Sequence, residues 1–228
     1  MSSDPNQNPV NPLPPLVVLL FLGIVVIEAA FSLGAQGYIG GPGAVGWRLW
    51  GIQTYAFSSE IFAWMWQTQQ FPPEHILRFV SYSFIHGSIT HAAFAGVILL
   101  AMGKMVAEAF GQWRMLVIFL LSGVGGALVY AVLLNDPVPL VGSFPNVYGL
   151  IGGFTYVLWR NLSEMGENQY RAFMLIGFLM AFQLIFGLLF GGQNDWIADV
   201  AGFIVGFGLS FVLSPGGWSR VRDQIRHD

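Results

Sequence analysis

Two histidines, a serine and an aspartate are the side chains of this sequence best suited to chemistry. His86 and His91 lie five residues apart, and Ser143 follows a glycine. Asp199 lies in the last long apolar stretch. A serine hydroxyl is a poor nucleophile until a neighbouring base takes its proton, and a carboxylate is a weak base for that purpose. These residue types raise the question of a hydrolytic site, which the surrounding sequence has to answer.

Metal and cofactor chemistry is not indicated by the same residues. Two helical side chains five positions apart project about 140° from one another, whereas helical metal ligands are usually spaced i, i+4. The chain has no cysteine, which excludes disulfides and thiolate chemistry. We therefore expect neither a metal nor another cofactor.

Composition indicates that these residues lie in a membrane protein. Hydrophobic residues make up 55% of the chain and charged residues 9%, with a mean hydropathy of +0.63, whereas soluble domains are about 25% charged. The net charge of −3 comes with no basic stretch, which argues against nucleic acid as a partner. Apolar segments that approach the ~20 residues of a membrane span cover 15–35, 88–109, 113–134, 145–160, 170–191 and 196–213. We predict an all-α integral membrane fold, a six-transmembrane-helix bundle over 15–213.

Basic residues predict the orientation of that bundle. With six spans, both ends of the chain and the even-numbered connections share one side of the membrane. That side holds most of the basic residues, namely Lys104, Arg114, Arg160, Arg171, Arg220, Arg222 and Arg226, and the other side holds only Arg48 and Arg78. The positive-inside rule therefore predicts a flexible cytoplasmic tail at 1–14 and a basic cytoplasmic tail at 214–228.

The connection between the first two spans is too long for an ordinary turn. It is rich in tryptophan, with Trp47, Trp50, Trp64 and Trp66, and poor in charge. We expect helical pieces lying in the outer membrane interface, although a flexible loop is the alternative.

Several stretches together resemble the rhomboid family of intramembrane proteases. In chain order they are RFVSYSFIHGSITH (78–91), GKMVAEAFGQWR (103–114), SGVGG (122–126), VGSFPNVYGLIGG (141–153) and ADVAGFIVG (198–206). Each stretch is a weak signal alone, but their order fits the family on a six-span topology. The resemblance covers roughly 76–213 and implies a rhomboid-like bundle with a long interfacial first loop.

The same resemblance implies that the catalytic residues are absent. Rhomboids cleave with a serine in a G-x-S-G motif, which a histidine on the sixth helix activates. Alignment places Phe144 at that serine, Pro145 at the following glycine and Asp199 at the histidine. His86 and His91 are retained, but Ala95 stands where the family has an asparagine of the oxyanion hole, a donor worth about 100-fold in rate. The resemblance therefore implies a rhomboid pseudoprotease, with no catalytic residues.

Glycines on two helices predict how the bundle is held together. Gly149 and Gly153 are four residues apart, as are Gly202 and Gly206, a spacing that lets helix backbones approach closely. Asp199 shares the face of the second pair. Its carboxylate is expected to pair with His91 or His86, to cap the helix in water near Asp195, or to form a proton or metal site.

Other polar residues in apolar segments also leave alternatives open. Glu28 could bind a partner or reach the interface. Lys104 and Glu108, four residues apart, are expected to pair with each other or with loop groups.

Partners are expected in the membrane. The fifth segment carries Phe178, Phe182 and Phe186, and in rhomboids this helix edges the opening for a substrate's transmembrane segment; the alternative is that these side chains face lipid. Together with Trp47 and Trp50 they are candidate partner-binding residues.

The leading hypothesis is an inactive rhomboid that binds transmembrane segments in quality control, dislocation or assembly. Expected partners are the lipid bilayer, other integral membrane proteins and a further copy or another rhomboid-like protein. The first alternative is an architectural subunit of a membrane complex. The second is a non-standard serine protease that uses Ser143 or an unrecognised nucleophile. All but one of the nine basic residues are arginines, a bias often seen in proteins of GC-rich bacterial genomes. The expected location is therefore a bacterial inner membrane.

Overall fold

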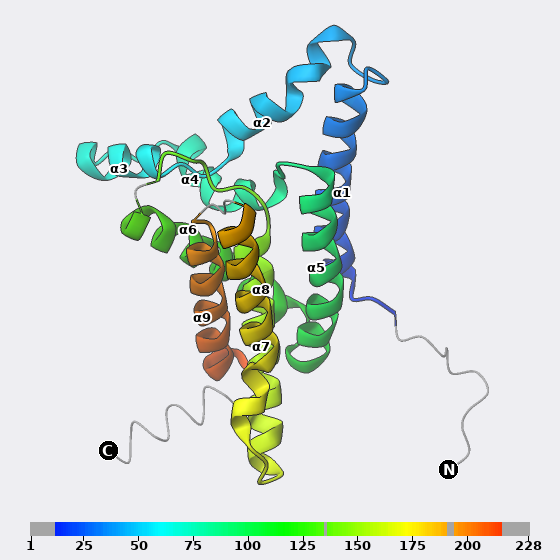
Figure 1. The fold of residues 1–228 in the computed structure, drawn as a ribbon, viewed down its shortest axis with the longest axis vertical. Coiled ribbons are helices and arrows are strands. Elements are labelled where there is room, and N and C mark those ends of the chain that lie inside the picture. The colour runs from blue at the N-terminus through cyan, green and yellow to red at the C-terminus, as the bar shows by residue number, and fades with distance from the viewer. Residues whose placement is uncertain (1–11, 135, 191–193, 216–228) are drawn as a thin grey trace, which may run out of the picture.

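The regular structure of this chain is helical (Figure 1). The computed structural model describes residues 12–134, 136–190 and 194–215. Apart from residues 12–14 and 214–215, the two predicted tails lie outside the described residues. In the described part, extended pairing is limited to one isolated bridge between Phe57 and Leu140. The predicted all-α fold is confirmed.

Long helices cover each of the six predicted apolar segments. Within the described residues they are α1 (Pro15–Ala35), α5 (Ile89–Phe110), α6 (Gln112–Leu134), α7 (Phe144–Glu164), α8 (Met174–Phe190) and α9 (Trp196–Leu213). By length and composition, four of them, α1, α5, α6 and α9, are able to cross a membrane. The other two are α7, whose last turns carry Arg160 and Glu164, and α8, which has only 17 residues.

The predicted limits of α7 and α8 differ from those observed. The fourth segment was expected to end at 160, but α7 continues to Glu164, whose carboxylate accepts a 2.6 Å hydrogen bond from Arg160. The fifth was expected to begin at 170, but a 3₁₀ helix, η3 (Gln169–Phe173), precedes α8. The side chain of Asn168 accepts a 3.0 Å hydrogen bond from the N–H of Tyr170 and favours this tighter turn.

Short helices fill the long connection between α1 and α5, as predicted. They are η1 (Pro42–Gly46), α2 (Trp47–Tyr55), α3 (Ser59–Thr68), α4 (Pro73–Ser81) and η2 (Tyr82–Phe84). The Ser58 side chain caps α3 by accepting a hydrogen bond from the N–H of Ile61, and Pro73 begins α4. Helices α2 to α4 lie at one end of the bundle (Figure 1).

Glycines allow the backbones of α7 and α9 to come into direct contact. A Cβ atom on Gly202 would lie 2.1 Å from the carbonyl oxygen of Pro145, and one on Gly206 would lie 2.0 Å from that of Gly149. A Cβ on Gly152 would lie 2.3 Å from the carbonyl oxygen of Phe203. These distances are far below van der Waals contact, so glycine is required for this helix pair.

Gly153 plays a different part from the one expected. A Cβ at this position would meet Val106 of α5 at 3.4 Å and Ser210 of α9 at 3.5 Å, which are ordinary contact distances. Gly152, one residue earlier, makes the tight approach to α9.

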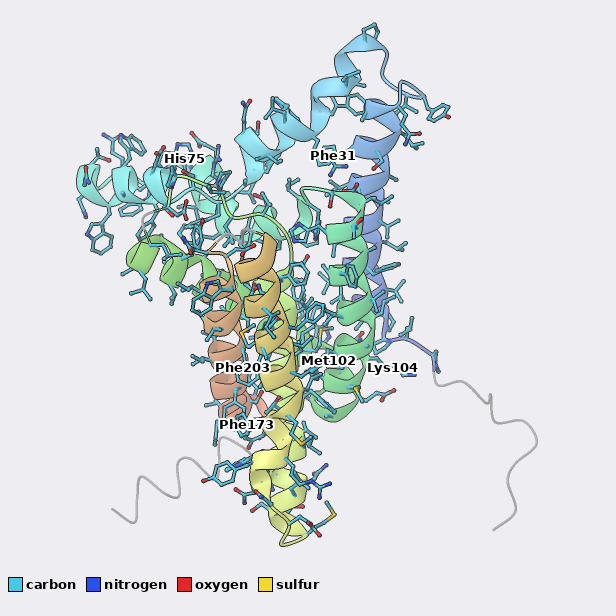
Figure 2. The ribbon with its side chains drawn as sticks, viewed as in Figure 1. Phe31, His75, Met102, Lys104, Phe173 and Phe203 are labelled. Atoms are coloured by element: carbon cyan, nitrogen blue, oxygen red, sulfur yellow. The ribbon has the colours of Figure 1, made fainter. Side chains whose placement is uncertain are left out.

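Apolar side chains cover the outside of the bundle. Val26 of α1, Val97 of α5 and Val132 of α6 are 63%, 65% and 68% exposed. Surfaces of this kind are unfavourable in water and suit lipid. Figure 2 shows His75 at the end of the bundle that carries α3 and α4, and Lys104 and Phe173 toward the other end. The predicted pair of Lys104 with Glu108 is present at 3.9 Å.

Candidate functional site

A cavity of about 750 Å³ lies among α5, α7, α8 and α9. Its wall is mainly apolar, but a histidine, a glutamine, two tyrosines and two aspartates also contribute. The lining residues are Gly87, Ser88, His91, Phe94, Ile98, Tyr130, Pro139, Leu140, Val141, Phe144, Tyr148, Phe178, Leu179, Phe182, Gln183, Asp195 and Asp199. This volume is in the range of small-ligand pockets.

An aromatic side chain stands where α7 begins. Phe144, the residue that the resemblance aligns with the nucleophilic serine, stacks its ring on that of His91 at 5.0 Å between centroids and 15° between planes. Tyr148, one turn later, meets Phe144 edge to face at 6.4 Å. The wall of the cavity is therefore aromatic at this point, and the ring of Phe144 offers no nucleophilic atom.

Ser143 points away from the cavity. It is fully buried and does not line the cavity, and its hydroxyl donates to the carbonyl oxygen of Ser83. The contact between Ser143 and His86 runs through the backbone, because the N–H of Ser143 donates to His86 Nε2 at 3.4 Å. Gly142 supplies the turn into α7 with φ of +94°, and a Cβ there would lie 2.7 Å from the His91 ring.

His86 is buried between the segments of the chain that lead into α5 and α7. It is 1% exposed, and its ring meets that of His91 edge to face at 5.2 Å. Burial lowers the pKa of His86 to about 4, and the neighbouring His91 acts in the same direction. His86 is therefore a neutral ring that accepts a backbone hydrogen bond, which is a structural role.

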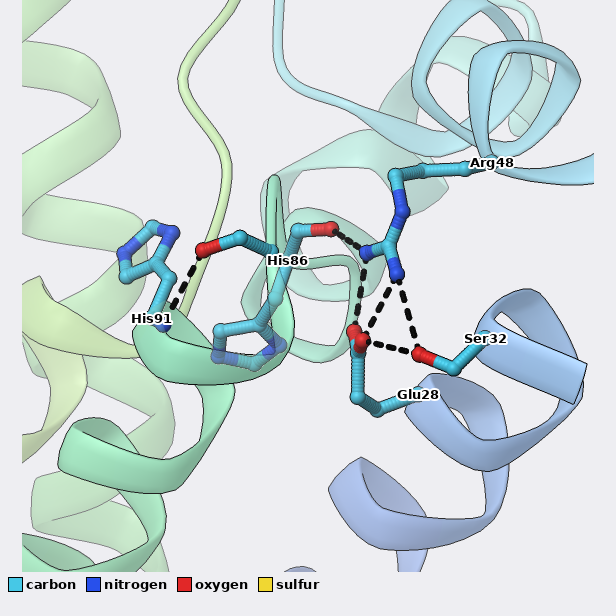
Figure 3. Close-up of polar contacts among 6 residues, drawn as sticks. Glu28, Ser32, Arg48, His86 and His91 are labelled. Atoms are coloured by element: carbon cyan, nitrogen blue, oxygen red, sulfur yellow. Dashed lines mark hydrogen bonds and ion pairs between the residues drawn. The ribbon is translucent and has the colours of Figure 1, made fainter. Parts of the chain in front are cut away.

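A cluster of polar groups beside His86 was missed by sequence reasoning. The guanidinium of Arg48 in α2 donates to both carboxylate oxygens of Glu28 in α1, at 2.9 and 2.6 Å. It also donates to the carbonyl oxygen of His86 at 2.6 Å, and Ser32 donates to Glu28 at 2.8 Å (Figure 3). The partner of Glu28 is thus inside the chain. A charged residue in an apolar helix together with an arginine in the following connection was the available signal.

Asp199 has a partner that was not anticipated. Its Oδ2 accepts a 2.9 Å hydrogen bond from the side chain of Gln183 in α8, instead of the expected bond from His86 or His91. The Asp199 side chain is also not in water, because the residue is 2% exposed. The hydroxyl of Tyr148 in α7 donates to Gln183 Oε1 at 3.2 Å. These three side chains link α7, α8 and α9, and a glutamine inside the otherwise apolar segment of α8 was the signal for the link.

The remaining aligned positions are apolar and buried. Ala95 is fully buried in α5. Pro145 lies in the first turn of α7, with its carbonyl oxygen against Gly202. Neither side chain can donate a hydrogen bond.

The aromatic residues expected to bind partners divide into two groups. Phe178 and Phe182 line the cavity and are 67% and 51% exposed, while the side chain of Phe186 lies outside the described residues. Trp47 and Trp50 lie in α2, away from the cavity lining. Trp47 packs against Gly34 and Gly40, and Trp50 is 56% exposed. Among the described candidates, those on α8 are the ones at the cavity.

Known proteins resemble this chain over about 60% of its length. RHOMBOID-like protein 4 of Arabidopsis thaliana is 31% identical over 136 residues, which are 60% of this chain and 34% of that protein. Rhomboid-like protease 3 of Toxoplasma gondii is 31% identical over 135 residues, 58% of this chain and 49% of that protein. Inactive rhomboid protein 2 of Homo sapiens is 27% identical over 143 residues, 63% of this chain and 16% of that protein. In each of these relatives the matched part covers less than half of the length.

The Rhomboid domain family model matches residues 73–216, which contain α4 to α9 and every residue that lines the cavity. The match covers the stretch, roughly 76–213, over which the sequence resembles the family. The chain therefore belongs to the rhomboid family and is an integral membrane protein.

Proposed function

We propose that this chain is a catalytically inactive rhomboid that binds transmembrane segments of other membrane proteins, in quality control, dislocation or assembly. The observation that carries the proposal is the cavity itself. It has a volume of about 750 Å³, and Phe144 stands at the aligned serine position and stacks on His91. A site that has this space and offers no nucleophile at the aligned position is suited to binding without cleavage.

Helix α8 supports binding from within the membrane. Its residues Phe178, Phe182 and Ile185 are 67%, 51% and 56% exposed, and two of them also line the cavity. An apolar transmembrane segment that reaches the cavity along α8 would cover these side chains. Inactive rhomboid protein 2 and inactive rhomboid protein 1 are among the relatives, and their names support a family branch without proteolysis.

The serine protease alternative is disfavoured by the environment of Ser143. Its hydroxyl is buried, bonds a backbone carbonyl and does not line the cavity. A serine-directed fluorophosphonate is therefore expected to leave the reconstituted protein unlabelled, with an active rhomboid as the positive control. Labelling that Ser143→Ala abolishes would contradict the proposal.

Binding is tested separately from hydrolysis with the variant Phe144→Ser. Because the proposed contacts lie along α8 as well, this variant is expected to keep its affinity for a transmembrane client within about threefold. Loss of all binding in Phe144→Ser, with the fold intact by size exclusion, would contradict a site that extends along α8.

We further infer that both termini face the cytoplasm, from the basic residues at the end of the bundle that carries Lys104 and Arg171. A bacterial inner membrane stays a prediction, because the relatives named above are plant, protozoan and human proteins.

A further inference from the structure

The cavity among α5, α7, α8 and α9 is lined by two aspartates as well as by apolar side chains. Asp195 precedes the first residue of α9, Asp199 lies in its first turn, and both line the cavity. The described residues that line it include neither lysine nor arginine. An occupant with complementary chemistry would offer apolar surface and one positive charge.

Asp199 is held by a neutral group. The carboxyl is 2% exposed, and among the described residues its hydrogen-bonded partner is the amide of Gln183. A carboxylate removed from water is stabilised far more by a cation than by an amide. Gln183 belongs to α8, the helix at the edge of the cavity. Its amide oxygen accepts a hydrogen bond from the hydroxyl of Tyr148. A cationic side chain entering beside α8 would compete directly with this amide.

We propose that the cavity selects transmembrane segments that carry one lysine or arginine, and that this cation replaces Gln183 as the partner of Asp199. The inference rests on the proposed function and names the chemistry of the client. Asp199 lies three residues after Trp196, where α9 begins, which places it about 4.5 Å along the helix. A client segment that begins level with α9 would meet Asp199 about one turn from its own end. The basic residue therefore belongs there and not at the centre of the client.

The experiment uses the full chain in lipid nanodiscs and three single-span peptides of leucine and alanine. The first carries a lysine one turn from one end, the second has leucine there, and the third carries the lysine at its centre. Binding is measured by energy transfer between a labelled peptide and a labelled protein. The first peptide is expected to bind about tenfold more tightly than the second, as a charge-assisted hydrogen bond gives, and the third is expected to bind like the second.

Two variants of the cavity should act in opposite directions. Asp199→Asn keeps the shape and removes the carboxyl that would pair with lysine, so the preference for the lysine peptide should fall to about onefold. Gln183→Leu removes the competing amide, so the preference should rise by several fold. Glu60→Gln in α3 removes an exposed carboxylate outside the cavity and should leave the preference unchanged. Circular dichroism and size exclusion check that each variant is folded. If Asp199→Asn does not fold, the lysine preference of Gln183→Leu is the test of the proposal.

The outcomes separate this inference from the proposed function. If the lysine and leucine peptides bind the wild type equally, selection by charge is overturned while binding of transmembrane segments stands. If neither peptide binds, the proposed function fails and the inference fails with it. A lysine preference that survives in Asp199→Asn overturns the assignment to this carboxyl.

Discussion

At the residue scale, Arg48 joins three parts of the chain with one side chain. It pairs with Glu28 of α1, bonds the carbonyl oxygen of His86 before α5, and lies 5.4 Å from the centre of the Phe31 ring. The side chains of Arg48 and Glu28 are only 23% and 7% exposed. Removing one charge of such a pair leaves the other buried without compensation, which costs more than the pair contributes.

Arg48→Met is therefore expected to lower the free energy of unfolding by about 3 kcal/mol, the lower end of the range for breaking a buried pair. The double variant Arg48→Met with Glu28→Gln should recover part of that loss, because no uncompensated charge remains. Arg160→Met is the control, since its pair with Glu164 is more exposed and should contribute at most about 1 kcal/mol. Thermal unfolding in detergent measures all three, and equal losses in Arg48→Met and Arg160→Met would contradict this account.

His86 should make stability depend on pH. Its folded pKa of about 4 lies below the ordinary value of 6.5, so the unfolded chain takes up a proton that the folded chain excludes. The stabilisation of the fold by neutral His86 is complete above pH 6.5. It is lost as pH falls toward 4, which lowers the free energy of unfolding by about 3 kcal/mol in all. Thermal unfolding between these pH values is expected to show the decline.

His86→Gln supplies the control for this prediction. Glutamine offers an acceptor to the N–H of Ser143 without a titrating ring. His91, Glu28 and Arg48 face the same region and remain in the variant. The decline between pH 6.5 and 4 should be shallower in His86→Gln than in the wild type, and identical slopes would exclude His86 as its source.

At the element scale, the contact between α7 and α9 depends on glycine. The Cβ positions of Gly202 and Gly206 fall on backbone atoms of α7, which cannot move aside as a flexible side chain can. Gly208, on the same helix, has nothing within 4 Å of its Cβ position. The chain thus contains its own comparison between a packed and an open glycine.

Gly206→Ala is expected to destabilise the fold by about 3 kcal/mol, the upper end of the range typical of overpacked cores. Gly208→Ala should be neutral or slightly stabilising, because alanine favours helix. Thermal unfolding of the two variants side by side is the measurement. A Gly206→Ala protein as stable as the wild type would mean that α7 and α9 are further apart than described.

Helices were largely predictable from the sequence, and side-chain partners were not. Apolar length alone located α1, α5, α6 and α9, since lipid imposes that length. The predicted end of α7 was wrong because the helix continues beyond its apolar part, through the polar pair of Arg160 and Glu164. The bond of Asp199 to Gln183 depends on how α8 packs against α9, and no local pattern along the sequence encodes that distance.

The bond from Arg48 to Glu28 was missed for the same reason. It joins residues 20 positions apart across a connection whose path was unknown from the sequence. Of the residues at the cavity, His91, Phe144 and Asp199 came from the family resemblance, whereas Tyr148 and Gln183 were not predicted.

At the scale of the whole molecule, the two ends of the bundle are chemically different. The end with α2 to α4 holds two arginines, Arg48 and Arg78, and the opposite end holds Lys104, Arg114, Arg160 and Arg171. Positive charge favours the cytoplasmic side. The end with α2 to α4 is therefore expected to face away from the cytoplasm.

Single cysteines can test this orientation without background, because the chain has none. Tyr38→Cys lies between α1 and η1, and Tyr170→Cys lies in η3, at residues that are 73% and 84% exposed. A membrane-impermeant maleimide applied to intact cells should label the first and not the second, until the cells are opened. The reverse pattern would invert the proposed orientation.

The most direct test of the central claim is photocrosslinking from the cavity in native membranes. A benzophenone amino acid replaces Phe182, which lines the cavity, or Val26, which is 63% exposed on α1 and serves as the control. Mass spectrometry then identifies each crosslinked segment. The account predicts intact transmembrane segments captured at Phe182 and absent at Val26. Segments cleaved within the membrane, or the same products at both positions, would contradict it.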